Sequence, residues 1–92
     1  MSVFVIFLSK TLDTAKLSLY ATQALPMVTA HGGTMLSGGQ ATFLNTSSDF
    51  DHGVVFEFPD RASVTAWYDS EEYQALAAVR SEAMKCSIVV LG

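Results

Sequence analysis

Two side chains in the first helical stretch of this 92-residue sequence have the chemistry needed for acid–base catalysis. Tyr20 and His31 lie three helical turns apart, so a helix would place both on one face. There His31 could act as general acid or base, and the Tyr20 hydroxyl could orient a substrate by a hydrogen bond. Alternatively, His31 ends the helix and bonds a main-chain carbonyl group.

Arg80 has the chemistry needed to bind an anion. It falls on a helical stripe with Tyr73, Leu76 and Met84, and a guanidinium on such a stripe can hold a substrate carboxylate by two parallel hydrogen bonds. The long side chain can equally pack along its stem while its head reaches water or pairs with an acid such as Glu57.

Glu57 is an acidic residue in the middle of an apolar strand, between Phe56 and Phe58. Burial would favour its protonated form, which would suit it to proton transfer and to substrate binding. The alternative is an ion pair with Arg80, Arg61 or a residue of a partner chain.

Trp67 and Tyr68 are large aromatic residues on one face of the helix that Asp60 can cap. Together with Tyr73 they could line a pocket for a flat apolar ligand. Aromatic residues at helical spacing also form ordinary core. We assign Trp67 and Tyr68 to the wall of a substrate cleft.

No motif in the sequence predicts a metal or a cofactor. Asp49, Asp51 and His52 share one polar stretch, but their spacing fits neither a calcium loop nor a zinc motif and favours a solvated loop. The pairs Gly32-Gly33 and Gly38-Gly39 lack the dinucleotide-binding fingerprint and the phosphate-loop lysine, so they indicate turns.

The composition narrows the class of protein. Half the residues are hydrophobic and 15% are charged, which is typical of one folded domain, here residues 1–92. Five basic against nine acidic residues give a net charge of −4, which argues against nucleic acid as a partner. Cys86 is the single cysteine, so we expect no internal disulfide and a buried, inert thiol.

Three apolar segments predict the central strands of a sheet: Val3–Leu8, Val54–Phe58 and Ser87–Leu91. The first of them is too short for a membrane span or a signal-peptide core, so we expect no membrane association and a cytoplasmic protein. A helix should begin after Asp13 and end at Gly32, with a kink or a break at Pro26.

The rest of the chain predicts shorter elements. Thr34–Leu36 and Ala41–Leu44 should be short strand pieces, followed by a loop over Asn45–His52. Asp60 and Ser70 can cap two further helices. The resulting order predicts an α+β, ferredoxin-like βαββαβ fold, an antiparallel sheet with helices on one face. Because its strands are apolar on both faces, we expect a homodimer that packs sheet against sheet.

Several segments at matching intervals resemble one known family. They are Tyr20 to Pro26, Ala30-His31-Gly32-Gly33, Gly38-Gly39, Glu57-Phe58-Pro59, Ala66-Trp67-Tyr68, Ser70, and Glu72-Tyr73-Gln74-Ala75-Leu76. The family is a domain of unknown function, DUF1330, within the dimeric α+β barrel superfamily. The resemblance implies the ferredoxin-like fold and the sheet-to-sheet dimer. Ser37 and Gly53 depart from the family pattern, which usually has basic residues there.

The superfamily resemblance leaves two hypotheses open, because it includes cofactor-independent monooxygenases, muconolactone-type isomerases, haem-dependent dismutases and non-catalytic domains. In the first, the protein is a cofactor-free enzyme, an isomerase or monooxygenase, acting on a small, partly apolar molecule with His31, Tyr20 and Arg80 as catalytic residues. In the second, it is a non-catalytic ligand-binding or dimerisation module. Haem binding through His31 is a weaker third possibility.

Overall fold

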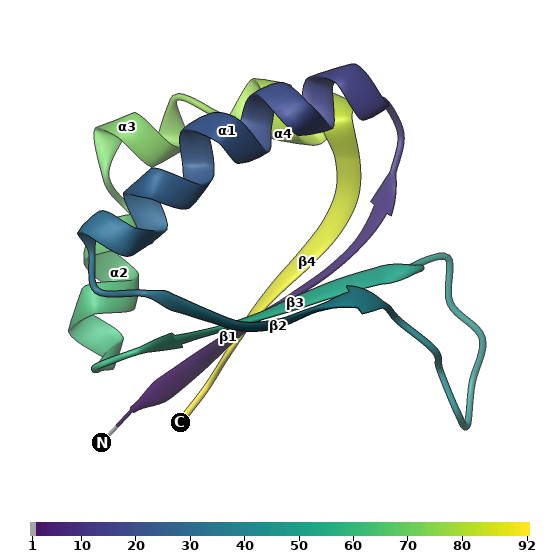
Figure 1. The fold of residues 1–92 in the computed structure, drawn as a ribbon, viewed down its shortest axis with the longest axis horizontal. Helices are drawn as coiled ribbons and strands as arrows, with labels where there is room; N and C mark the ends of the chain where they lie inside the picture. The colour runs from purple at the N-terminus through teal and green to yellow at the C-terminus, as the bar shows by residue number, and fades with distance from the viewer. Residues whose placement is uncertain (1) are drawn as a thin grey trace.

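The chain forms a four-stranded sheet with its helices on one face, as the computed structural model of residues 2–92 shows (Figure 1). In chain order the elements are β1 (Val3–Thr11), α1 (Thr14–Ala30), β2 (Thr34–Gln40), β3 (His52–Phe58), α2 (Arg61–Tyr68), α3 (Glu71–Gln74), α4 (Ala77–Ala83) and β4 (Met84–Leu91). The strands are antiparallel and lie in the order β2-β3-β1-β4. The predicted ferredoxin-like fold is confirmed.

The pairing of β1 with β3 and β4 decides which side chains lie under the helices. Val5 and Phe7 are 0% and 9% exposed on the helix side, whereas Phe4 is 36% exposed on the open side. The alternation continues through the paired residues of the neighbouring strands. One prediction is wrong here: β4 pairs with β1 alone among the described strands, so it forms an edge of the sheet and not part of its centre.

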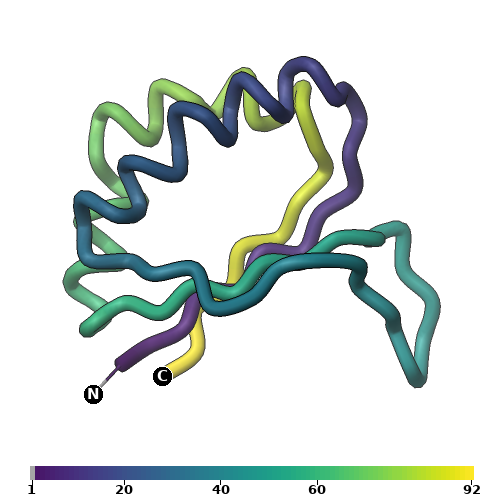
Figure 2. Tube along the Cα trace, in the orientation of Figure 1, coloured from purple at the N-terminus to yellow at the C-terminus, as the bar shows by residue number. Residues whose placement is uncertain are grey.

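Helix α1 begins as the sequence predicts, because Asp13 Oδ1 accepts a hydrogen bond of 3.0 Å from the Lys16 main-chain N–H. It runs without a break through Pro26, so the two-piece alternative is not observed. Gly32 has φ of +86°, the left-handed conformation that ends a helix. The chain then turns directly into β2 (Figure 2).

The predicted strand at Ala41–Leu44 is wrong. β2 continues from Thr34 through a bulge to Gln40, and the Ala41 N–H bonds the Asp51 carbonyl at 3.0 Å. Beyond that contact the chain leaves the sheet as a long connection to β3 (Figure 2).

An aromatic cluster joins the helices to the sheet. Trp67 of α2 is 1% exposed, and its ring centroid lies 4.6 Å from that of Tyr73 and 5.6 Å from that of Phe58. Such contacts between large buried rings contribute strongly to a small core. Within residues 2–92 no helix is both long and apolar enough to cross a membrane.

Candidate functional site

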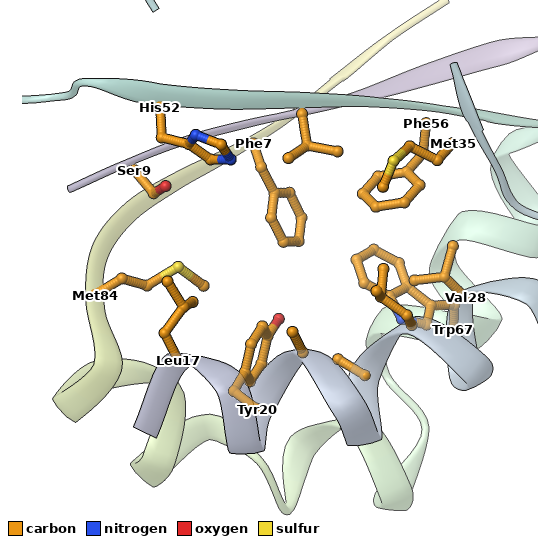
Figure 3. A pocket seen from close by; sticks show the side chains of 14 residues that line it. Phe7, Ser9, Leu17, Tyr20, Val28, Met35, His52, Phe56, Trp67 and Met84 are labelled. Atoms are coloured by element: carbon orange, nitrogen blue, oxygen red, sulfur yellow. The ribbon is translucent and has the colours of Figure 1, made fainter. Parts of the chain in front are cut away.

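An apolar cavity of about 210 Å³ lies between α1 and the helix-covered face of the sheet (Figure 3). One wall is formed by side chains of β1 and β3, among them Phe7, Val54 and Phe56. The opposite wall is one face of α1, where residues at helical spacing are apolar or aromatic: Leu17, Tyr20, Ala21, Ala24 and Val28. The cavity therefore results directly from the packing of an amphipathic helix across two strands.

Two polar side chains lie together at one end of this cavity. Ser9 of β1 and His52 of β3 are direct antiparallel partners, and Figure 3 shows both beside Met84. Ser9 is buried, whereas His52 is exposed at the margin. The Ser9 hydroxyl and the His52 imidazole therefore offer hydrogen-bonding groups to a polar substituent at this end of the mostly apolar lining.

Sequence reasoning missed His52, which it placed in a solvated loop. The strand begins at His52 and not at Val54, so the two-residue alternation places His52 on the same face as Val54 and Phe56. The signal was present in the sequence, since His52 lies two positions before Val54 on the core-facing side.

The ring of Tyr20 lines the cavity, but its hydroxyl already forms a hydrogen bond with another side chain. Tyr20 Oη lies 2.6 Å from Tyr73 Oη, which also accepts a hydrogen bond of 3.1 Å from Nη1 of Arg80. Burial raises the pKa of Tyr20 far above its ordinary value, and burial also raises the pKa of Tyr73 against the opposing effect of its hydrogen bonds. Both hydroxyls are therefore neutral at physiological pH.

Arg80 does not line the cavity beneath α1. It faces a neighbouring, more open pocket of about 470 Å³ between α4 and β4, which Met84 and Cys86 also line. Its guanidinium carbon lies 5.9 Å and 5.5 Å from the ring centroids of Tyr68 and Tyr73. Burial opposes its charge, but the hydrogen bond to Tyr73 and the nearby tyrosines outweigh burial and raise the pKa of Arg80.

Trp67 and Tyr68 take different positions. Trp67 lines the cavity, and its Nε1 is buried with no hydrogen-bond partner among the described residues. Tyr68 packs edge-on against Trp67, at 5.8 Å between centroids, and faces a separate surface pocket between α2 and β4. Only Trp67 is therefore placed to touch a molecule in the cavity.

The structure does not bring His31 to the cavity. His31 is the C-cap of α1, and its Nδ1 donates to the Met27 carbonyl at 2.9 Å. Eleven residues of helix separate it from Tyr20, which is about 16 Å along the axis at 1.5 Å per residue. The geometry matches the alternative in which His31 ends the helix.

Glu57 lies on the other face of the sheet. It is paired with Phe4 of β1 and Thr34 of β2, all on the side away from the helices. In the described residues it has no ion pair with Arg80 or Arg61. It therefore cannot contact a molecule in the cavity of its own chain.

No metal site is evident: residues 2–92 contain no cluster of three or more histidine, cysteine or acidic side chains. Cys86 is a free, half-buried cysteine, and burial raises the pKa of its thiol. The thiol is thus less buried than the sequence predicts, and its low reactivity stays a prediction.

Comparison with solved structures finds the same fold in several proteins. A protein of unknown function from Rhodopseudomonas palustris has a TM-score of 0.80 at 15% identity, covering 98% of this chain and 80% of its own. A dimeric ferredoxin-like protein of unknown function from Thermobifida fusca has a TM-score of 0.66 at 18% identity, covering 100% and 91%. SnoaB, a cofactor-independent oxygenase from Streptomyces nogalater, has a TM-score of 0.64 at 6% identity, covering 99% and 89%.

These identities show the fold alone. A search of the curated proteins finds no match. The sequence model of a domain of unknown function, DUF1330, matches residues 2–92. Because this match spans nearly the whole sequence, the chain belongs to the DUF1330 family.

Proposed function

We propose that this protein binds a small, mostly apolar organic molecule in the cavity between α1 and the sheet. The observation that carries the proposal is a space of about 210 Å³ with apolar walls and two polar groups at one end. An apolar cavity of about 150 Å³ is enough for benzene. The volume therefore suits a compound with one ring and a short substituent.

The cavity would contact the two ends of such a molecule with different kinds of side chain. Phe7, Phe56 and Trp67 offer aromatic surfaces for the ring. Ser9 and His52 would hydrogen-bond a polar substituent at the opposite end (Figure 3). A few polar groups in a mostly apolar pocket are the usual arrangement for orienting a small ligand.

The proposal includes a homodimer formed by the open face of the sheet. That face carries exposed apolar side chains, with Phe4, Val89 and Leu91 at 36%, 42% and 51%. An apolar patch of this kind on a small domain favours association, and a second copy would cover it symmetrically. The similar Thermobifida fusca protein is described as dimeric, which supports this part of the proposal.

Calorimetry with single-ring compounds such as phenol and benzyl alcohol tests the cavity. Ala21 lines the cavity and Ala15 lies on the exposed side of the same helix. Ala21→Leu should fill the space and abolish binding, while Ala15→Leu should leave binding unchanged. Equal binding by both variants, or no binding by the unmodified protein, would contradict the proposal.

A second candidate function is catalysis on the same molecule, in a cofactor-independent isomerisation or oxidation. The observation that favours it is the imidazole of His52 at the polar end of the cavity, since histidine is the side chain most often used for proton transfer. The likeness to SnoaB supports only a fold that accommodates such chemistry.

Turnover of a bound compound would itself establish catalysis, and His52→Gln then tests whether His52 carries it. An enzyme should lose most of its kcat while the dissociation constant of the compound changes little. If no bound compound is converted, the binding function stands, and His52→Gln should affect affinity alone.

A further inference from the structure

We propose that the bound molecule is a ring compound with a carboxylate on a short chain, and that Met84 is a movable partition between its two ends. The ring would occupy the cavity under α1, and the carboxylate would reach Arg80 in the neighbouring pocket. This inference rests on the proposed function and names its ligand class.

The two spaces adjoin each other in the structure. Met84 lines both the apolar cavity and the pocket that contains Arg80. Ser9 lines the first space and Cys86 the second, and these two residues are direct partners across β1 and β4. Directly paired residues in an antiparallel sheet lie about 5 Å apart, so a short chain spans the boundary.

Arg80 differs from the other basic side chains of the chain in its partners. Three lysines have acidic partners: Lys10 with Asp51, Lys16 with Glu82 and Lys85 with Asp49. Arg61 donates to the main-chain carbonyl of Gly92. Within residues 2–92, Arg80 has no carboxylate at ion-pair distance and bonds only the neutral hydroxyl of Tyr73. In a chain with nine acidic residues, this leaves a cation available for an acidic ligand.

The guanidinium is also held in place. One of its N–H groups donates to Tyr73, and its central carbon lies 5.9 Å and 5.5 Å from the ring centroids of Tyr68 and Tyr73. Arginine has five N–H donors in a rigid fork, so several remain free to bind a ligand. A fixed fork matches the two oxygens of a carboxylate and loses little entropy on binding. Lys85 also lines this pocket, but its ammonium is paired with Asp49 at 3.3 Å. Among the described residues, Arg80 is therefore the cation of the pocket without an acidic partner, which suits a single negative charge better than a phosphate dianion.

Met84 is suited to a moving partition. It is 5% exposed and is the first residue of β4, directly after the end of α4. A methionine side chain is unbranched and has several rotatable bonds, so it can change rotamer without moving the backbone. Its displacement would join the two spaces into one site with an apolar end and a cationic end.

The test is calorimetry with three matched pairs: phenylacetate, 3-phenylpropionate and 4-phenylbutyrate, each beside its primary amide. At least one acid should bind about tenfold more tightly than its amide, as expected for a charge-assisted pair. Arg80→Gln should abolish this difference. Arg61→Gln removes the same charge elsewhere and should preserve the difference. Met84→Ile, whose branched side chain is stiff at χ1, should reduce it several-fold.

The outcomes separate the two proposals. If the amides bind but no acid is preferred, or if the preference survives in Arg80→Gln, the carboxylate assignment is overturned while the cavity proposal stands. If the preference is the same in Met84→Ile as in the unmodified protein, the partition is overturned. If neither acids nor amides bind while benzyl alcohol does, the carboxylate assignment is overturned and the cavity proposal stands. If benzyl alcohol does not bind either, both proposals fail.

Discussion

Three polar side chains inside the core form a connected chain of hydrogen bonds. Tyr20 of α1 bonds Tyr73 of α3, and Tyr73 bonds Arg80 of α4. These bonds link three helices directly above the sheet. Because Tyr20 and Tyr73 are 5% and 0% exposed, water cannot replace a missing partner.

Tyr73→Phe should therefore destabilise the protein by about 1–3 kcal/mol, since it leaves the buried Tyr20 hydroxyl without a partner. Tyr20→Phe should cost less, because Tyr73 keeps its bond to Arg80. Urea unfolding measures both. Tyr68→Phe serves as the matched control, because the Tyr68 hydroxyl makes no hydrogen bond within residues 2–92. This substitution should change stability by less than about 0.5 kcal/mol.

The same tyrosines predict how stability depends on pH. Burial raises the pKa of both hydroxyls in the folded chain, so the folded state keeps protons that the unfolded state releases above about pH 10. Their contribution is complete below pH 10 and falls as the pH rises further. The double variant Tyr20→Phe/Tyr73→Phe should lose less stability between pH 9 and pH 11 than the unmodified protein. Equal losses in unfolding experiments would argue against the assignment.

At the residue scale, sequence reasoning identified side chains better than it identified their contacts. Tyr20 and Trp67 line the cavity as expected of aromatic residues on helix faces. His31 lies at the C-cap of α1 and bonds the Met27 carbonyl, and helical spacing alone did not decide between this position and the cavity. Glu57 lies on the open face of the sheet, opposite Phe4, and this register with β1 could not be predicted from the sequence.

At the scale of elements, the end of α1 is fixed by a close approach to β3. A methyl group at Gly33 would lie 2.5 Å from Cγ1 of Val28 and 2.7 Å from Cζ of Phe58. At Gly38 the nearest atom would be 3.6 Å away, an ordinary contact. The glycine at position 33 thus lets the helix end pack directly on the sheet.

Gly33→Ala should destabilise the protein by about 1–3 kcal/mol, because Val28 and Phe58 must move to admit the extra carbon. Gly38→Ala makes the same chemical change without the overlap and should cost clearly less. Thermal unfolding of the two variants checks this. A Gly38→Ala variant as unstable as Gly33→Ala would show that strand geometry, and not packing at the helix end, limits stability.

Helix caps were the elements most reliably predicted. Asp13, Asp60 and Ser70 each accept the expected main-chain hydrogen bond, because a cap depends on neighbours only three residues away. Strand limits were less predictable. The extension of β3 to His52 depends on its pairing with Ser9, more than forty residues away in the chain.

At the scale of the whole molecule, the open face of the sheet is the surface through which the proposed homodimer would form. Val55 lies on this face opposite Ile6, and both are half-buried in the single chain. The order of elements predicts this face from sequence, because strands apolar on both sides need a second cover. The sequence of one chain does not identify the molecule that covers this face.

Val55→Lys should convert the proposed homodimer into a folded monomer, because it would place a charge within an apolar interface. Gln23→Lys adds the same charge on the exposed side of α1 and should leave the dimer intact. Sedimentation and circular dichroism measure assembly and folding separately. A monomeric unmodified protein, or a Val55→Lys variant that stays dimeric, would contradict the sheet-to-sheet arrangement.

The most direct test of the central claim, a ligand cavity between α1 and the sheet, is NMR of ¹³C-methyl-labelled methionine during titration with benzyl alcohol. Met35 and Met84 line the cavity, whereas Met27 packs against the core elsewhere. We predict saturable shifts of the Met35 and Met84 methyl signals with little change at Met27. Unchanged signals at Met35 and Met84, or equal shifts at all three, would contradict a binding site in this cavity.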